Sequence, residues 1–166
     1  MTAGSSGRSA PETSKPLRPA AEERWADELA ALAAADAQRG AEIPRGWRLS
    51  PHSVRAFIVG DEVLGVTRKF YGDDPLVDRA IVTLLGRQGL MLVGEPGTAR
   101  SMLSELLAAA VCGASTLTIQ GSAGTTEDHV RYSWNYALLI ADGPTRRALV
   151  PSPVYQAMEQ GSIVRF

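Results

Sequence analysis

The chain has 166 residues, of which 45% are hydrophobic and 21% are charged, as in one ordinary globular domain. Its formal net charge of -1 argues against a surface for nucleic acids or other polyanions. The first residues contain no apolar signal-peptide segment, and no apolar run approaches the roughly 18 residues of a membrane span. We therefore expect a cytoplasmic protein without a membrane anchor. The single cysteine, Cys112, excludes an intrachain disulfide and is expected to be buried.

The N-terminal part is expected to hold a tail and two helices. Residues 1–20 are rich in Gly, Ser, Pro and Ala, which predicts disorder. Residues 21–39 are Ala-rich and predict a helix that Gly40 ends and that docks weakly or not at all. Ser50, followed by a proline, is an N-cap signal for a helix over residues 51–59.

The middle of the chain predicts a β-strand, an α-helix and a second strand. Residues 74–85 first form a helix with a broad apolar stripe. Residues 90–93 are apolar at every position, which predicts a parallel strand buried on both faces. A helix over residues 102–112 and an alternating strand over residues 116–120 follow. Together they predict a right-handed βαβ unit.

The C-terminal part predicts a hairpin, a helix and a third strand. Thr125, with an aspartate three residues later, is a weak capping signal for a short helix. Residues 136–140 and 148–150 flank Asp-Gly-Pro, which predicts a β-hairpin. Residues 153–160 predict a helix, and residues 163–166 begin a strand.

Residues 90–101 read Leu-Met-Leu-Val-Gly-Glu-Pro-Gly-Thr-Ala-Arg-Ser, an apolar strand, a Gly/Pro-rich turn and the start of a helix. This is the context of a Walker A loop, G-x-x-x-x-G-K-[ST], whose backbone N–H groups cradle phosphate oxygens. Ser101 would offer its hydroxyl to a Mg²⁺ ion that bridges the β- and γ-phosphates. The alternative is an ordinary turn between a strand and a helix. The predicted phosphate-binding residues are Gly94, Glu95, Pro96, Gly97, Thr98, Ala99, Arg100, Ser101 and Met102.

Two positions depart from the Walker A pattern. Ala99 stands where the second glycine is usual, and Arg100 stands where the lysine is usual. Arginine keeps the positive charge but carries a wide planar fork, so the exchange is not conservative at a tight site. Misplacing one charged hydrogen bond would reduce affinity roughly tenfold to a hundredfold. We expect phosphate binding to survive through the loop amides, and hydrolysis to suffer more.

From residue 46 onward the chain resembles the MoxR-like branch of the AAA+ ATPases. The matching segments read Lys-Phe-Tyr-Gly-Asp-Asp at 69–74, Leu-Val-Gly-Glu-Pro-Gly-Thr-Ala-Arg-Ser-Met-Leu-Ser-Glu-Leu-Leu at 92–107, Ile-Gln-Gly-Ser-Ala-Gly-Thr-Thr-Glu-Asp at 119–128, Tyr-Ser-Trp-Asn-Tyr at 132–136 and Gly-Ser-Ile-Val-Arg-Phe at 161–166. The resemblance implies an α/β fold, a partial P-loop NTPase core of the three-layer αβα type with strand order 5-1-4-3-2.

The resemblance also implies a division of the chain and a function. Residues 21–60 would be a helical N-terminal segment, and residues 61–166 a partial nucleotide-binding core with strands 1 to 3. Tyr71 and Gly72 match the segment beside the adenine, although Tyr71 could instead only cover the core. The implied cofactors are ATP and Mg²⁺. The implied activity is ATP hydrolysis coupled to remodelling of a partner protein, by a homohexamer with a possible partner that has a von Willebrand factor A domain.

In the family, the acidic pair of Walker B follows the third strand, and the sensor strand, the trans-acting arginine and the helical lid come later. We therefore expect no catalytic residue within these 166 residues and no ATP hydrolysis by this chain alone. The alternative is a truncated, non-hydrolysing nucleotide-binding or interaction fragment. The family's fourth strand lies between the first and third, so residues 90–93 and 163–166 would lack a partner and favour self-association, unless they pair directly.

Other polar and aromatic residues predict no further site. Glu127 and Asp128 are expected to favour a helix N-terminus rather than to act in catalysis. His52 and His129 have no neighbours at metal-ligand spacing. Trp134 and Tyr136 are expected to serve packing or assembly, with base stacking as the alternative.

Overall fold

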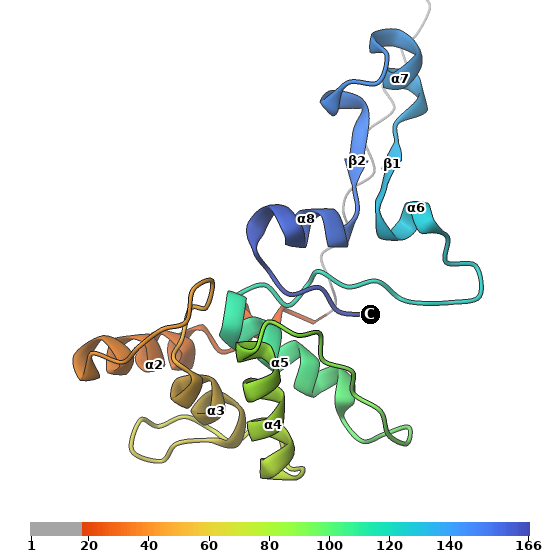
Figure 1. Cartoon of the computed structure of the whole chain (residues 1–166). Coiled ribbons are helices and arrows are strands. Elements are labelled where there is room, and N and C mark those ends of the chain that lie inside the picture. The colour runs from red at the N-terminus through yellow and green to blue at the C-terminus, as the bar shows by residue number, and fades with distance from the viewer. Residues whose placement is uncertain (1–17) are drawn as a thin grey trace, which may run out of the picture.

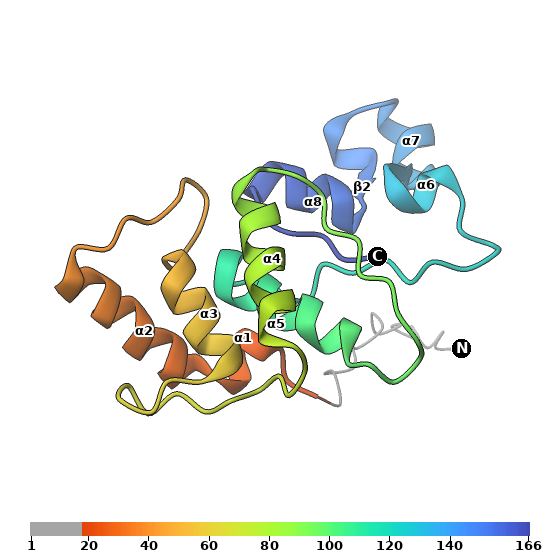
Figure 2. The same ribbon diagram turned by 60° about the horizontal axis from the view of Figure 1, so that its bottom comes forward.

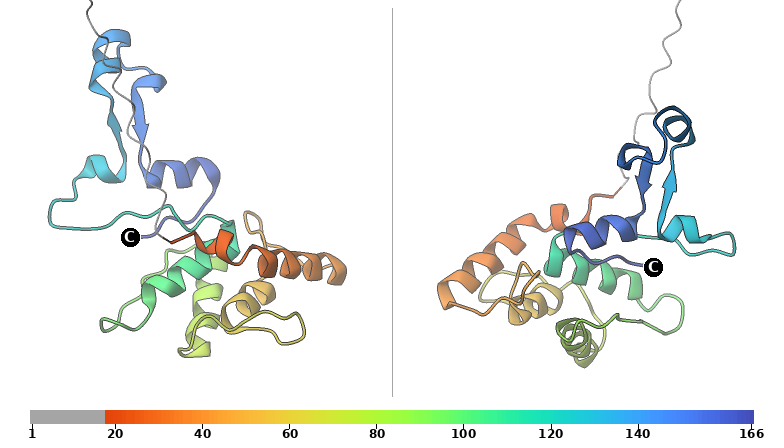
Figure 3. Two further views of the ribbon diagram at one scale, coloured as in Figure 1. Left: turned by 180° about the vertical axis from the view of Figure 1, so that it is seen from behind. Right: turned by 45° about the horizontal axis from the view of Figure 1, so that its top comes forward.

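Residues 18–166, which this computed structural model describes, form a body of helices from which a two-stranded arm projects (Figure 1). Figure 3 shows from behind that the arm extends away from the helices. The tail predicted at residues 1–20 lies largely outside the described residues. No helix among residues 18–166 combines the length and apolar character needed to cross a membrane.

The N-terminal segment forms two helices in place of the single helix predicted. Helix α1 covers Ala21–Arg24 and helix α2 covers Ala26–Arg39. The break falls at Trp25, whose backbone leaves the helical region with φ -121° and ψ 34°. Gly40 ends α2 in the left-handed conformation, as predicted.

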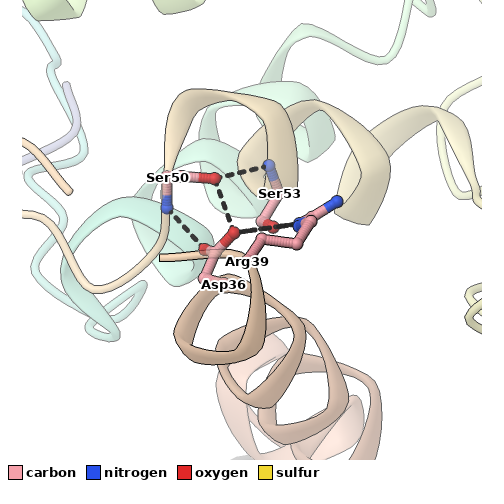
Figure 4. A network of polar contacts seen from close by, with 4 residues as sticks. All are labelled: Asp36, Arg39, Ser50 and Ser53. Carbon is pink, nitrogen blue, oxygen red and sulfur yellow. Dashed lines mark hydrogen bonds and ion pairs between the residues drawn. The ribbon is translucent and has the colours of Figure 1, made fainter. Parts of the chain in front are cut away.

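The expectation of weak docking for this segment is wrong, because α2 carries a buried carboxylate (Figure 4). Asp36 is 1% exposed and accepts a hydrogen bond of 2.8 Å from the backbone N–H of Ser50. The hydroxyls of Ser50 and Ser53 donate to the same carboxylate at 2.7 Å, and the Arg39 guanidinium donates at 3.0 Å. The network joins α2 to the start of helix α3, which covers Pro51–Val59.

Helix α3 lies at the centre of the body and packs against α2, α4 and α5. Helix α4 covers Asp74–Leu85, and α5 covers Arg100–Cys112. Ser50 caps α3 by accepting the N–H of Ser53 at 3.2 Å, which confirms the N-cap prediction. The fully buried core side chains include Leu32, Val54, Phe57, Ile58, Val77, Leu103 and Leu106.

The predicted strand at Leu90–Val93 is an extended segment without a strand partner among the described residues, and the prediction of a regular strand is wrong. Leu90 and Leu92 pack against the core, whereas Met91 and Val93 are exposed. The segment is therefore buried on one face only. Figure 2 shows it passing from α4 to α5 along the side of the body.

The two other predicted core strands meet at one position only. Thr118 and Arg165 form an isolated parallel bridge. The N–H of Ile119 donates to the Arg165 carbonyl at 2.8 Å, and the N–H of Arg165 donates to the Leu117 carbonyl at 2.9 Å. The predicted parallel direction is present, but neither residues 116–120 nor residues 163–166 form a full strand.

The arm contains a hairpin with a different first strand from the one predicted. Strand β1, Tyr132–Trp134, pairs antiparallel with β2, Leu149–Pro151. Residues 136–140 are not a strand but part of helix α7, Tyr136–Asp142. The Asn135 side chain caps this helix by accepting the Leu138 N–H at 3.3 Å, a local hydrogen bond that favours the helix.

Short helices flank the hairpin. The 3₁₀ helix η1, Arg146–Ala148, precedes β2, and helix α8, Pro153–Gln160, follows it as predicted. Helix α6, Glu127–Val130, begins one residue later than the predicted capping signal implies. Its cap is Thr126, whose N–H donates to His129 Nδ1 at 3.1 Å. His129 is therefore a capping residue.

Candidate functional site

The predicted phosphate loop connects the extended segment to α5 and contains two left-handed backbone positions. Gly97 has φ 84°, a conformation that favours glycine. Ala99 has φ 56° and ψ 23° and is the N-cap residue of α5. The Walker A pattern has a glycine at the position of Ala99. Glycine adopts left-handed backbone angles readily, and the structure has such angles at this position.

Two side chains close the loop on the carbonyl of Glu95. The Thr98 hydroxyl donates to this carbonyl at 2.9 Å, and Arg100 Nη2 donates to it at 3.0 Å. The Arg100 side chain folds back over the loop, and its Cδ atom lies 3.7 Å from the position of a Cβ built on Gly94. The positive charge is therefore held against the turn, with N–H groups to spare for an anion.

The first turn of α5 presents Ser101, an exposed residue whose hydroxyl makes no hydrogen bond within residues 18–166. Its carbonyl accepts from Ser104 Oγ at 2.9 Å and from Arg165 Nη1 at 3.2 Å, which fixes the backbone of this turn. No group of three or more His, Cys, Asp or Glu side chains in the described part could hold a metal ion.

An apolar cavity of about 410 Å³ lies against the loop. Phe70, Leu76 and Leu103 line its apolar part, and Gly94, Thr98 and Arg100 line it on the loop side. A ligand that fits both parts has an apolar ring at one end and an anion at the other. A nucleotide has this pattern.

Of the predicted loop residues, Gly94, Thr98 and Arg100 line the cavity, whereas Met102 packs against the core. The other two predicted residues are placed differently. Tyr71 does not line the cavity; it is 83% exposed, with the Arg68 guanidinium 5.8 Å from its ring centre. Phe70 lines the wall instead. Gly72 permits this arrangement, because a Cβ there would lie 2.4 Å from the Phe70 ring.

Sequence reasoning missed Phe70 and Leu76 as cavity residues. The signal that could have found Phe70 is its place as an apolar residue directly before the Tyr-Gly pair. Leu76 gave no separate signal, because it belongs to the apolar stripe of α4.

A larger groove of about 910 Å³ opens on another side of the loop. Its walls are the extended segment 88–92, the first turn of α5 and the C-terminal residues 163–166. The groove separates the first and third predicted strands, and no backbone ladder joins them among the described residues.

The other residues singled out from the sequence make structural contacts or lie on the surface. Glu127 pairs with Arg131 at 3.0 Å along α6, which agrees with a structural role. Cys112 is half-buried rather than buried, and its thiol donates to the Ala108 carbonyl at 3.1 Å. Trp134 packs edge-on against Tyr132 at 5.7 Å, and Tyr136 is exposed.

Residues 89–166 match the family model described as AAA domain (dynein-related subfamily). The chain is also 54% identical over 156 residues to a protein of Escherichia coli (strain K12) described as uncharacterized protein YehL. That similarity covers 94% of this chain and 42% of the relative, so the chain spans less than half of the relative's length. No solved structure matches the chain.

The family match supports an AAA+ ATPase module in this part of the chain. Together with the helices and the small sheet, it confirms the predicted fold class, a partial α/β P-loop NTPase core.

Proposed function

We propose that this chain is the ATP-binding part of a MoxR-like AAA+ ATPase. The observation that carries the proposal is the loop at residues 94–101, which lies between an apolar cavity and the first turn of α5. In this proposal residues 94–102 bind the phosphates and the cavity receives the adenine, with Phe70, which Gly72 accommodates, beside the base in place of Tyr71.

The electrostatics of the loop support phosphate as the ligand. The N-terminal end of α5 carries a partial positive charge and unpaired backbone N–H groups. Arg100 adds a full positive charge at the same end, held by the Glu95 carbonyl. Ser101, on the first turn of α5, would coordinate Mg²⁺ together with the β- and γ-phosphates.

For the whole protein we propose ATP hydrolysis that remodels a client protein, in a cytoplasmic homohexamer with a possible partner that contains a von Willebrand factor A domain. The AAA match supports nucleotide binding and oligomerisation in general. We further propose that residues 21–60 form a helical N-terminal segment and that residues 61–166 belong to the nucleotide-binding core.

Arg100 favours a second candidate, a module that binds nucleotide without hydrolysing it. Its guanidinium already donates to a carbonyl of the loop, so the fork is held against the turn and reaches phosphate only with its remaining N–H groups. Phosphoryl transfer depends on the position of such charges more strongly than binding does. An ATP titration of Arg100→Lys tests this point. Tighter binding would show that the planar guanidinium lowers ATP affinity, and weaker binding would show that the loop has adapted to arginine.

Titration of the 166-residue chain with ATP·Mg²⁺ tests the binding site. We expect Gly97→Val to weaken binding at least about tenfold, because valine is strained at φ 84° and distorts the loop amides. Gly121→Val is the matched control, since a Cβ at Gly121 meets nothing within 4 Å and its φ is not left-handed. Equal ATP affinities of the wild type and Gly97→Val would show that the loop is not the binding site.

A further inference from the structure

Lys69 is a buried cation with a complete set of partners. The residue is 6% exposed, and its ammonium donates to the carbonyls of Phe57 at 3.0 Å and Thr67 at 2.9 Å. The third partner is the carboxylate of Glu28, with which Lys69 forms an ion pair. All three N–H groups of the ammonium are therefore used.

Two aromatic rings complete the surroundings of this ammonium. Lys69 Nζ lies 4.3 Å from the ring centre of Phe57 and 5.4 Å from that of Trp25. The two rings meet edge-on, with centres 6.0 Å apart. Burial lowers the pKa of Lys69, while Glu28 opposes this shift. The carboxylate of Glu28 is thus what keeps a charged lysine acceptable in this position.

The backbone around Lys69 continues directly into the wall of the cavity beside the phosphate loop. The next residue is Phe70, which lines that cavity. The N–H groups of Lys69 and Phe70 both donate to the carbonyl of Ile58 at 3.1 Å, so the two residues are held as one unit against α3. A displacement of the Lys69 side chain would therefore act on the backbone unit that carries Phe70.

Two of the groups around the ammonium come from the N-terminal segment. Glu28 lies on α2 and Trp25 at the junction of α1 and α2, while Phe70 belongs to the loop before α4. If α2 moved away, the Lys69 charge would lose its counterion in a dry environment and would have to turn toward water. The position of Phe70 therefore depends on whether α2 is docked.

We propose that Lys69 is a positioning residue through which the N-terminal segment α1–α2 controls base binding at the nucleotide site. The segment holds the Lys69 ammonium through Glu28, and the ammonium sets the position of Phe70 on the cavity wall. This inference rests on the proposed nucleotide-binding function. Release of α1–α2 by a partner would weaken the hold on the base and leave the phosphate loop intact.

The first experiment compares ATP with inorganic tripolyphosphate, which has the phosphates but no base. In the 166-residue chain, we expect Glu28→Gln to weaken ATP binding by at least about fivefold and to leave tripolyphosphate affinity within about twofold. Effects of roughly two- to thirtyfold are typical of residues that act on a site without touching the ligand. Asp27→Asn, an exposed acid on the same helix, is the matched control and should change neither affinity.

The outcomes separate the two proposals. Equal losses of ATP and tripolyphosphate affinity in Glu28→Gln, or no loss of either, would overturn the role of Lys69 while leaving the nucleotide site in place. A wild-type chain that binds neither ligand, or a Gly97→Val chain that binds both as well as the wild type, would overturn the proposed function and this inference with it.

A second measurement, the fluorescence emission of Trp25, requires no substitution at Glu28 or Lys69. It can therefore be made even if Glu28→Gln fails to fold. In a chain with Trp47→Phe and Trp134→Phe, Trp25 is the sole indole, and its ring lies beside the Lys69 ammonium. Coupling between sites is reciprocal, so base binding must in turn act on α2. We expect ATP, but not tripolyphosphate, to change the Trp25 emission. An unchanged emission at saturating ATP, or the same change with both ligands, would overturn the inference.

Discussion

Ala99 adopts a backbone conformation that is unfavourable for a residue with a Cβ. Left-handed geometry costs such a residue about 1–2 kcal/mol relative to the right-handed helix. Ala99 carries this strain at the N-cap of α5, where it also ends the phosphate loop. The rest of the loop therefore holds the backbone against a local preference for another conformation.

Replacing Ala99 with glycine tests this strain. We expect Ala99→Gly to stabilise the chain by about 0.5–1 kcal/mol in urea unfolding, because glycine adopts positive φ without a steric cost. The matched control is Ala33→Gly, at an exposed position within the right-handed helix α2, where the same substitution should destabilise by about 1 kcal/mol. Destabilisation by both substitutions would show that the loop is not strained at Ala99.

At the level of the elements, the Asp36 network attaches α2 to the N-terminal end of α3. Burial raises the pKa of Asp36, but hydrogen bonds from the Ser50 backbone N–H, from the Ser53 and Ser50 hydroxyls and from Arg39 outweigh it and hold the pKa below its usual value. One carboxylate thus binds the capping residue of α3 and a second serine of its first turn. The network joins two helices that the sequence predicts as separate elements.

The lowered pKa of Asp36 predicts a pH dependence of stability. Because the native pKa lies below the unfolded value of about 3.9, the stabilisation is present above that pH and is lost as the pH falls through the native pKa. We expect Asp36→Asn to cost about 2–3 kcal/mol near pH 7. In urea unfolding, the difference from the wild type should shrink below about pH 4.

The exposed Asp27→Asn on the same helix serves as the control, with a stability close to that of the wild type at every pH. A loss in Asp36→Asn that stays constant down to pH 3 would show that the ionised form of Asp36 has no special role.

At the level of the whole molecule, the open groove leaves apolar backbone segments without strand partners. Met91 on one wall and Phe166 on the other are exposed, and so is Val93, two residues after Met91 on the same segment. The backbone of residues 90–93 pairs with no strand in the described part of the chain. Extended apolar segments of this kind are templates for pairing with another chain.

We expect the 166-residue chain to self-associate with rising concentration in sedimentation velocity experiments. The double substitution Met91→Lys and Val93→Lys should shift it toward monomer, because charge on an edge opposes pairing. Val63→Lys changes an even more exposed valine, on the loop before α4, and should leave the association unchanged. Monomeric behaviour of the wild type across the concentration range would contradict this prediction.

The sequence by itself predicted most of the helices and the loop at residues 94–101 that leads into α5. Ser50, Gly40 and Gly161 mark helix ends through hydrogen bonds and backbone angles that involve only a few neighbouring residues. The loop at residues 94–101 is likewise a contiguous segment, so its pattern could be read directly. Local interactions of this kind need no knowledge of distant parts of the chain.

Tertiary structure alone decided which segments became strands and which polar groups were buried. Leu90–Val93 has the composition of a strand, but a strand exists only with a partner, and no described segment supplies one. Lys69 and Glu28 are separated by 41 positions in the sequence, and their ion pair exists because α2 packs onto α3. The link from the N-terminal segment to the cavity wall depends on this packing, since a buried charge is set by its surroundings in space and not by its neighbours along the chain.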